Sequence, residues 1–97
     1  MKCYYVYILS NKYNTVFYVG VTNNLEIRVL QHKQGQGEGS VFTSKYLCNM
    51  LLYYEEFPDI RFAIDREKQL KRWKREWKLD LIRKENPELE DLAANWY

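Results

Sequence analysis

Two apolar stretches near the start of the chain have the composition of paired β-strands. Residues 3–9 and 16–22 are rich in β-branched and aromatic side chains, which are common in strands. Between them, residues 10–15 are rich in the polar side chains that favour turns. The pattern predicts a β-hairpin with its turn centred between Lys12 and Tyr13.

The register of this hairpin follows from the position of its turn. Side chains alternate between the two faces of a strand, so one face of the hairpin carries the pairs Leu9 and Val16, Tyr7 and Tyr18, and Tyr5 and Gly20. The missing side chain at Gly20 leaves space for a ligand or another backbone beside the phenols. An aromatic-lined sheet core explains each tyrosine equally well.

A short helix is predicted after the hairpin, between Thr22 and Gly35. Asn23 is a candidate N-cap with Glu26 three residues later, and Gly35 is a typical helix stop.

Arg28 and His32 are four residues apart in this helix and lie on one face, beside the stripe formed by Leu25 and Val29. A histidine in that position is either a hydrogen-bonded core group or a catalyst. An inward-facing arginine indicates a carboxylate partner or a bound phosphate.

Residues 35–40 are rich in glycine, but their spacing matches neither of the common nucleotide-binding glycine motifs, so we expect a loop. In residues 41–46 that follow, two hydroxyl side chains and Lys45 are candidates for contact with a phosphate backbone, unless Lys45 is simply a solvated loop lysine.

The second half of the chain changes from a strand pattern to a helical one. Residues 49–57 are continuously apolar enough for a third strand covered on both faces. From Ile60 onward a helical stripe predicts core positions at Phe62, Ala63, Leu70, Trp73, Trp77 and Leu81. A break near 73–77 splits it into two helices, and Asn86-Pro87 ends the second. Residues 88–97 either form a short acidic helix or fray.

Glu67 lies at the border of that stripe, with Lys71, Lys74 and, if the helix continues past 73–77, Lys78 along the same edge. Spacing alone favours an ion pair between Glu67 and Lys71. The functional alternative is a ligand for Mg²⁺, which is commonly held by one or two carboxylates, water and substrate phosphate.

Composition limits the class of protein. The 97 residues, 46% of them hydrophobic, predict one α/β (α+β) domain over residues 1–97, with a core at 3–84 and an acidic tail at 85–97. The net charge is only +2, yet residues 61–84 hold ten basic and four acidic side chains. That segment either binds phosphates or is a solvated helix face.

The cysteines and the N-terminal sequence indicate a cytoplasmic protein. Cys3 and Cys48 lack a metal-binding spacing and are expected to be reduced thiols, and the first residues do not resemble a signal peptide. The chain also has no apolar run long enough to cross a membrane. A monomer is compatible with the sequence, which leaves the oligomeric state open.

Five sequence elements, in order, resemble the GIY-YIG nuclease superfamily, in particular its small bacterial stand-alone members. They are Tyr5-Val6-Tyr7, Tyr18-Val19-Gly20, the helix with Arg28 and His32, the loop Phe42-Thr-Ser-Lys-Tyr46, and Arg66-Glu67-Lys68. Tyr5 and Val6 replace the Gly and Ile of the name motif, and Val19 replaces its second Ile. The resemblance implies a three-stranded antiparallel sheet flanked by helices and a DNA or structured nucleic-acid substrate.

The resemblance also implies roles for individual residues. Tyr7 and Tyr18 would organise the attacking water, one of them acting as or relaying to a general base. Arg28 would neutralise charge on the scissile phosphate, and His32 would handle protons or bind phosphate. Glu67 would hold Mg²⁺ or Mn²⁺. Members of the family often have an asparagine after this glutamate, for which Asn86 is the only candidate before the tail.

Three functions are compatible with these residues. The first is a metal-dependent phosphodiesterase, an endonuclease whose role in DNA repair would be an analogy to larger relatives. The second is a non-catalytic nucleic-acid-binding module that uses the basic helix face of residues 61–84; the candidate nucleic-acid contacts are Lys71, Lys74 and Lys78 on that face and Lys45 in the loop. The third is an adaptor in which the tryptophan-bearing helix pairs with another protein or with a second copy of itself. Dependence on a divalent metal distinguishes the first from the second.

Overall fold

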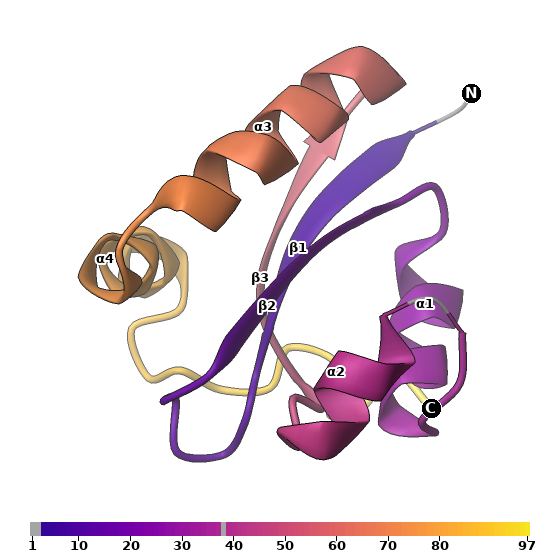
Figure 1. Ribbon diagram of the computed structural model, residues 1–97, viewed down its shortest axis with the longest axis vertical. Helices are drawn as coiled ribbons and strands as arrows, with labels where there is room; N and C mark the ends of the chain where they lie inside the picture. The colour runs from indigo at the N-terminus through magenta and orange to yellow at the C-terminus, as the bar shows by residue number, and fades with distance from the viewer. Residues whose placement is uncertain (1–2, 38) are drawn as a thin grey trace.

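A computed structural model describes residues 3–37 and 39–97 of the chain. Three strands and four helices follow one another in the order β1 (Tyr4–Ser10), β2 (Phe17–Thr22), α1 (Leu25–Lys33), α2 (Ser40–Lys45), β3 (Met50–Phe57), α3 (Ile60–Arg72) and α4 (Arg75–Glu85) (Figure 1).

The strands form one antiparallel sheet in the order β2-β1-β3, with helices on both faces, which confirms the predicted α+β architecture. Alternate residues of β1 enter two separate apolar cores. Val6 and Ile8 pack with α3 and α4, whereas Tyr7 and Leu9 pack with α1. Figure 1 shows α3 and α4 on one side of the sheet and α1 and α2 on the other. The central strand therefore presents Tyr7 to the α1 side.

The hairpin forms as predicted, but its register is displaced by two residues. Tyr7 is opposite Gly20, and Tyr18 is opposite Leu9, not Tyr7. The reason is the turn, in which the Asn11 side chain accepts bonds from the backbone N–H groups of Thr15 and Val16. Asn14 adopts a positive φ of 57°, a conformation that asparagine tolerates well. A shift of two keeps every side chain on its predicted face.

Helix α1 begins one residue later than predicted. Its N-cap is Asn24, not Asn23, because the Asn24 side chain accepts a bond from the Ile27 N–H at 3.2 Å. Gly35 follows the helix with a φ of 71°. The predicted loop at 35–40 includes residue 38, which lies outside the described residues.

Residues 40–45 form helix α2, where the sequence analysis expected a continuation of the loop. Gly39 precedes it with a φ of 79°. One turn of helix has little periodicity to detect, and Ser, Val, Phe and Thr are weak helix formers.

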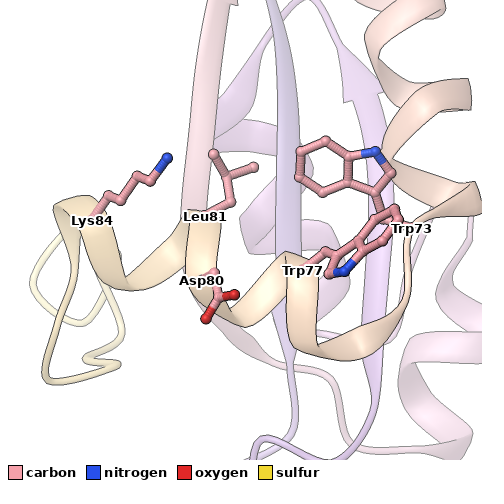
Figure 2. A pocket seen from close by; sticks show the side chains of 5 residues that line it. All are labelled: Trp73, Trp77, Asp80, Leu81 and Lys84. Atoms are coloured by element: carbon pink, nitrogen blue, oxygen red, sulfur yellow. The ribbon is translucent and has the colours of Figure 1, made fainter.

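Helices α3 and α4 are separated at Trp73 and Lys74, as predicted. The stripe is less buried than expected, since the side chains of Phe62 and Trp77 are 58% and 52% exposed. The break turns α4 away from the direction of α3, so a wheel extended through it misplaces Trp77. Figure 2 shows Trp77 beside Trp73 at the start of α4.

Strand β3 is covered on both faces only in its first half. Leu51, Leu52 and Tyr53 are buried, whereas Tyr54 is 40% exposed. The prediction of a fully covered strand was therefore wrong for its second half, which alternates as an edge strand does.

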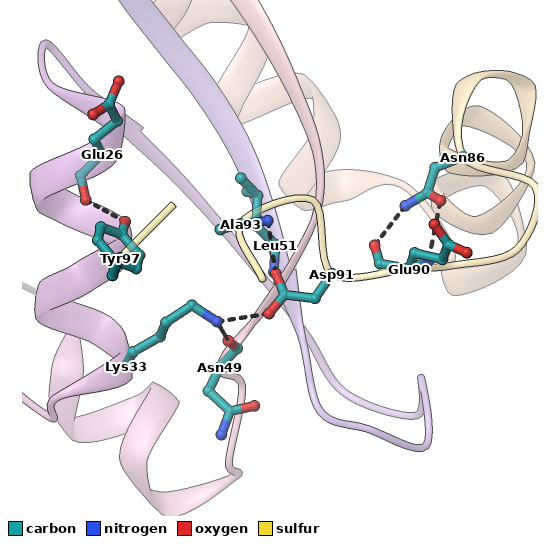
Figure 3. Close-up of polar contacts among 9 residues, drawn as sticks. All are labelled: Glu26, Lys33, Asn49, Leu51, Asn86, Glu90, Asp91, Ala93 and Tyr97. Atoms are coloured by element: carbon teal, nitrogen blue, oxygen red, sulfur yellow. Dashed lines mark hydrogen bonds and ion pairs between the residues drawn. The ribbon is translucent and has the colours of Figure 1, made fainter. Parts of the chain in front are cut away.

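The acidic tail neither forms a helix nor frays, but returns across the sheet (Figure 3). The Asp91 carboxylate accepts bonds from the N–H groups of Leu51 and Ala93, both at 3.0 Å, and pairs with Lys33 at 2.7 Å. Ala93 is buried in the core beneath α1. The Tyr97 hydroxyl donates to the carbonyl of Glu26. These contacts tie the tail to both β3 and α1.

Within the described residues, no helix combines the length and hydropathy needed to cross a membrane.

Candidate functional site

A buried hydrogen-bonded chain links β1 to α1 and α2. The Tyr7 hydroxyl lies 2.9 Å from Nε2 of His32, and Nδ1 of His32 lies 3.0 Å from Oγ1 of Thr43. Tyr7 is completely buried, and His32 is 3% exposed. The i, i+4 spacing predicted for α1 therefore does point His32 at the hairpin.

The partners of Thr43 decide which way these bonds run. Its Oγ1 is also 3.3 Å from the carbonyl oxygen of Gly39 and 3.4 Å from that of Ser40. Carbonyl oxygens only accept, so the single hydroxyl hydrogen of Thr43 points at them and Oγ1 accepts from His32. His32 then carries its proton on Nδ1, which leaves Nε2 to accept the Tyr7 hydroxyl proton.

The same environment keeps His32 neutral. Burial, and secondly the charge of Arg28, lower the pKa of His32 from 6.5 to about 4. A neutral imidazole with a free lone pair on Nε2 is what the direction of the bond from Tyr7 requires. At neutral pH the pair is a phenol that donates to an imidazole base.

Tyr18 completes a cluster with Tyr7 and His32, which we call the tyrosine–histidine cluster. The Tyr18 ring centroid lies 6.3 Å from that of Tyr7 and 5.2 Å from that of His32. Because of the shifted register, the two tyrosines are diagonal rather than directly opposed. Tyr18 is only partly buried, so it is the more accessible of the two phenols.

The segment around the start of α2 covers this cluster. A side chain at Gly39 would overlap the Tyr18 hydroxyl and come within 3.2 Å of Cε1 of His32. The Phe42 ring packs against Tyr18 with its centroid 5.8 Å away. The fold thus places the backbone of Gly39 in contact with two members of the cluster, a position that only glycine fits.

Gly20 makes room for the Tyr7 ring, not for a ligand as the sequence analysis expected. The space above it is filled by the Tyr7 phenol, since a Cβ there would lie 2.9 Å from Cε1 of Tyr7 and would overlap Cζ and the hydroxyl. Gly20 is opposite Tyr7 in the sheet, and its missing side chain lets the phenol lie flat across β2. The expected space for a ligand is occupied by Tyr7 itself.

Arg28 lies one helical turn before His32 on α1 and is half-buried. Its charge acts on the His32 ring, as the lowered pKa of His32 shows. The guanidinium is therefore a cation beside the tyrosine–histidine cluster. A cation at that position favours an anionic ligand.

Glu67 belongs to α3, on the opposite face of the sheet from α1. Successive helix residues are about 100° apart, so Arg66 and Glu67 lie on opposite sides of the buried line through Ala63 and Leu70. Arg66 pairs with Glu55 on β3 at 2.9 Å. Glu67 therefore lies on the β2 side of α3, while Tyr18 of β2 faces the opposite side of the sheet.

The surroundings of Glu67 match the ion pair that its spacing suggests. Its side chain is 17% exposed, and Oε1 lies 3.5 Å from Nζ of Lys71. Among residues 3–37 and 39–97, no group of three or more His, Cys, Asp or Glu side chains is arranged to hold a metal ion.

Comparison with known proteins identifies the domain. A family model described as the GIY-YIG catalytic domain matches residues 3–80. The chain belongs to the GIY-YIG family.

Two relatives of this GIY-YIG chain are called UPF0213 proteins. That of Staphylococcus haemolyticus is 35% identical over 82 residues, covering 84% of this chain and 96% of the relative. That of Clostridium perfringens is 41% identical over 78 residues, covering 80% of this chain and 81% of the relative. The solution NMR structure of the UPF0213 protein BH0048 from Bacillus halodurans shares the fold, with a TM-score of 0.56, 24% identity and coverage of 96% and 97% of the two chains.

Membership of the GIY-YIG family carries general properties. It implies nuclease activity and a nucleic-acid substrate, and nucleases of this family generally use divalent metals. The names of the relatives add nothing on activity.

The lysines proposed to bind nucleic acid differ in exposure. Lys45, Lys71 and Lys74 are exposed, and Lys78 is half-buried, with its pKa lowered by burial. Lys45 lies over the ring of Tyr46, with Nζ 5.4 Å from the centroid. Lys71, Lys74 and Lys78 lie at the end of α3, in the break and on α4, whereas Lys45 lies on α2, on the other side of the sheet.

The sequence analysis named the Thr43 hydroxyl only as a candidate phosphate contact and did not place Gly39 in the site, whereas both contact His32 from a segment read as loop. One candidate, Asn86, has another task. Asn86 is buried, and its amide donates to the carbonyls of Leu52 and Glu90 at 3.0 and 2.8 Å. Asn86 thus anchors the tail. Because both hydrogens of its side-chain amide are used in these bonds, it cannot donate a hydrogen bond to the candidate site.

Proposed function

We propose that this protein is a metal-dependent endonuclease that hydrolyses phosphodiester bonds in DNA or structured nucleic acid. The observation that carries the proposal is the hydrogen bond from the Tyr7 hydroxyl to Nε2 of a neutral, buried His32. Family membership supports the reaction class, and the hydrogen bond supports the roles of these two residues.

The pair solves a chemical difficulty. A free phenol has a pKa near ~10 and is a poor base at neutral pH. Nε2 of His32 accepts the Tyr7 hydrogen bond and is the atom to which the Tyr7 proton can pass as the Tyr7 oxygen takes one from water. Because the pKa of His32 is lowered to about 4, the transfer depends on the substrate phosphate, whose negative charge raises that pKa when it binds beside Arg28. The Thr43 hydroxyl holds the imidazole in the tautomer that this transfer needs.

The reaction then balances as follows. The water oxygen forms a bond to phosphorus while its proton moves to the Tyr7 oxygen, and the Tyr7 proton moves to Nε2 of His32. The bond from phosphorus to the leaving oxygen breaks, and that oxygen takes a proton from solvent. Tyr18, the more exposed phenol, orients the water, and Arg28 offsets the charge that develops on the phosphate.

Glu67 is the carboxylate proposed to hold the divalent ion. A single protein carboxylate suits Mg²⁺ or Mn²⁺, with water and substrate oxygens as the remaining ligands. When bound, the ion supplies Lewis acidity that polarises the phosphoryl oxygen and stabilises the leaving oxygen. The pair with Lys71 at 3.5 Å is of the kind that contributes less than about 1 kcal/mol, so it yields readily to a metal.

The test is a cleavage assay on labelled single-stranded, duplex and branched DNA and RNA, with Mg²⁺, Mn²⁺ or EDTA. Wild type is compared with Glu67→Gln and with Asp65→Asn, which removes an exposed carboxylate from the same helix. We expect metal-dependent cutting that Glu67→Gln abolishes and Asp65→Asn retains. Cutting that survives Glu67→Gln would show that the metal glutamate is misassigned.

Two observations favour a second function, that of a non-catalytic nucleic-acid-binding module. Tyr7 has no exposed surface, and Glu67 already has a partner in Lys71. In that case the same assay shows no cutting in any metal, while binding persists in EDTA and weakens steeply with salt.

A further inference from the structure

A hollow of about 280 Å³ lies along α4, on the opposite face of the sheet from the tyrosine–histidine cluster. Its lining residues are Trp73, Trp77, Asp80, Leu81 and Lys84 (Figure 2). The volume is close to the lower end of the range for small-ligand sites, about 300 Å³.

The two indoles give the hollow flat apolar walls. The ring planes of Trp73 and Trp77 meet at 83°, with their centroids 6.1 Å apart. Trp77 is 52% exposed, although it is one of the largest apolar side chains in the chain. A half-exposed tryptophan beside a second one offers a stacking surface that the protein itself leaves uncovered.

Positive charge surrounds these walls. Nζ of Lys74 lies 5.8 Å from the Trp77 ring centroid, and the guanidinium of Arg66 lies 5.2 Å from that of Trp73. Lys84 lines the hollow directly. Arg66 is also paired with Glu55, so Lys74 and Lys84 are the two cations that this hollow offers to a phosphate.

We propose that the hollow binds an unpaired nucleobase of the nucleic-acid substrate, which stacks on the exposed Trp77 ring and meets the perpendicular Trp73 ring edge to face. Lys84 and Lys74 contact the phosphates on either side of that base. The Asp80 carboxylate accepts a hydrogen bond from an exocyclic amino group, which favours cytosine or adenine over thymine. The inference rests on the proposed function, because it assigns a second contact to the same substrate.

An apolar protein segment fits the hollow less well. Covering it would remove water from Asp80 and from the two lysines without providing hydrogen bonds, which is costly. A nucleotide offers both kinds of partner, an aromatic ring for the indoles and phosphates for the lysines.

The hollow also lies near the path to the tyrosine–histidine cluster. Arg75, at the start of α4, donates to the carbonyl of Thr15 in the β1–β2 turn at 3.2 Å. That turn leads directly into β2, which carries Tyr18. One strand of nucleic acid bound in the hollow can therefore continue along the free edge of β2.

The test measures binding in EDTA, so that no cleavage takes part. The probe is a short fluorescent oligodeoxycytidylate, and the variants are Trp77→Ala and Phe62→Ala. The Phe62 variant also removes an exposed aromatic ring from the basic helices and serves as the control. We expect Trp77→Ala to weaken binding about tenfold and Phe62→Ala to leave it unchanged. A sugar–phosphate oligomer without bases should bind wild type and Trp77→Ala equally.

Further variants keep the proposal falsifiable. Trp77→Phe retains a smaller ring and should bind with intermediate affinity. This variant tests the contribution of the Trp77 ring if the alanine variant does not fold. Asp80→Asn should reduce the preference for oligodeoxycytidylate over oligothymidylate. Equal binding by wild type and a folded Trp77→Ala, no binding by wild type, or the same loss for the base-free oligomer would each overturn the proposal.

This outcome is separable from that of the proposed function. Base-dependent binding without metal-dependent cutting would retain the nucleobase site and reject the nuclease. Metal-dependent cutting with no effect of Trp77→Ala on binding would retain the nuclease and reject the nucleobase site.

Discussion

Tyr7 and His32, on different elements, form a buried hydrogen bond of 2.9 Å in which the phenol donates to Nε2. Its direction depends on Thr43, which accepts from Nδ1 at 3.0 Å. The geometry of the proposed site thus rests on a hydroxyl from the short helix α2.

Replacing Thr43 by valine tests that dependence. Thr43→Val keeps the shape but removes the acceptor, so the buried Nδ1–H of His32 loses its partner. We expect a loss of about 1–3 kcal/mol in the free energy of unfolding, measured by urea denaturation. Nitrogen-15 NMR should show the imidazole losing its preference for the Nδ1–H form, and cleavage should slow. Thr43→Ser should behave as wild type; an unchanged tautomer in Thr43→Val would contradict the assignment.

Gly20 and Tyr7 should show a strong coupling. In wild type, Gly20→Ala places a methyl group against the Tyr7 ring, and we expect a loss of about 1–3 kcal/mol in stability. In a Tyr7→Leu background the overlapping atoms are gone, so the same change should be nearly neutral. A double-mutant cycle from thermal unfolding measures the difference. Equal costs in the two backgrounds would mean that Gly20 is needed for its backbone alone.

The pKa of His32 predicts how stability depends on pH. The folded-state pKa is about 4, below the ordinary 6.5, so between these values the unfolded chain binds more protons at this site. Stability should therefore fall as the pH drops from 6.5 toward 4, by up to about 3 kcal/mol from this group. His32→Gln should lack this component in denaturation at several pH values. Parallel pH curves for the two proteins would contradict the shift.

The tail should contribute to stability through Asp91. Asp91→Ala leaves the N–H groups of Leu51 and Ala93 without their acceptor, so we expect a loss of about 1–3 kcal/mol. Glu88→Ala, which removes an exposed carboxylate from the same segment, should stay within about 0.5 kcal/mol of wild type. Similar unfolding midpoints for all three proteins would show that the tail is dispensable.

Elements were predictable where apolar residues recur with a regular spacing or where turn-forming residues mark the ends. The hairpin strands, α1 and the break between α3 and α4 follow from β-branched runs, helix spacing and the wheel of apolar residues. The register of the hairpin was not, because Asn11 and Asn14 set the turn through side-chain bonds and a positive φ that the pattern does not reveal. The assignment of side chains to the two faces of the hairpin was still correct, because the predicted register differs from the observed one by two residues.

The site was predictable where it depends on spacing and not where it depends on a distant segment. The i, i+4 relation places Arg28 and His32 together, and alternation places Tyr7 and Tyr18 on one face. Thr43 and Gly39 contact His32 because the segment before and within α2 folds back onto α1, and no local sequence pattern predicts this packing. The burial of Tyr7 and the exposure of Trp77 are likewise results of packing.

The most direct test of the account compares the cleavage rate of Tyr7→Phe with that of Tyr5→Phe. Both variants remove one phenolic oxygen from the same face of β1, but only Tyr7 donates to His32. We predict that Tyr7→Phe slows metal-dependent cleavage of the preferred substrate by about 10²–10⁴-fold, and that Tyr5→Phe cuts at nearly the wild-type rate. Equal rates for Tyr7→Phe and wild type would contradict the assignment of the Tyr7–His32 pair as the proton acceptor.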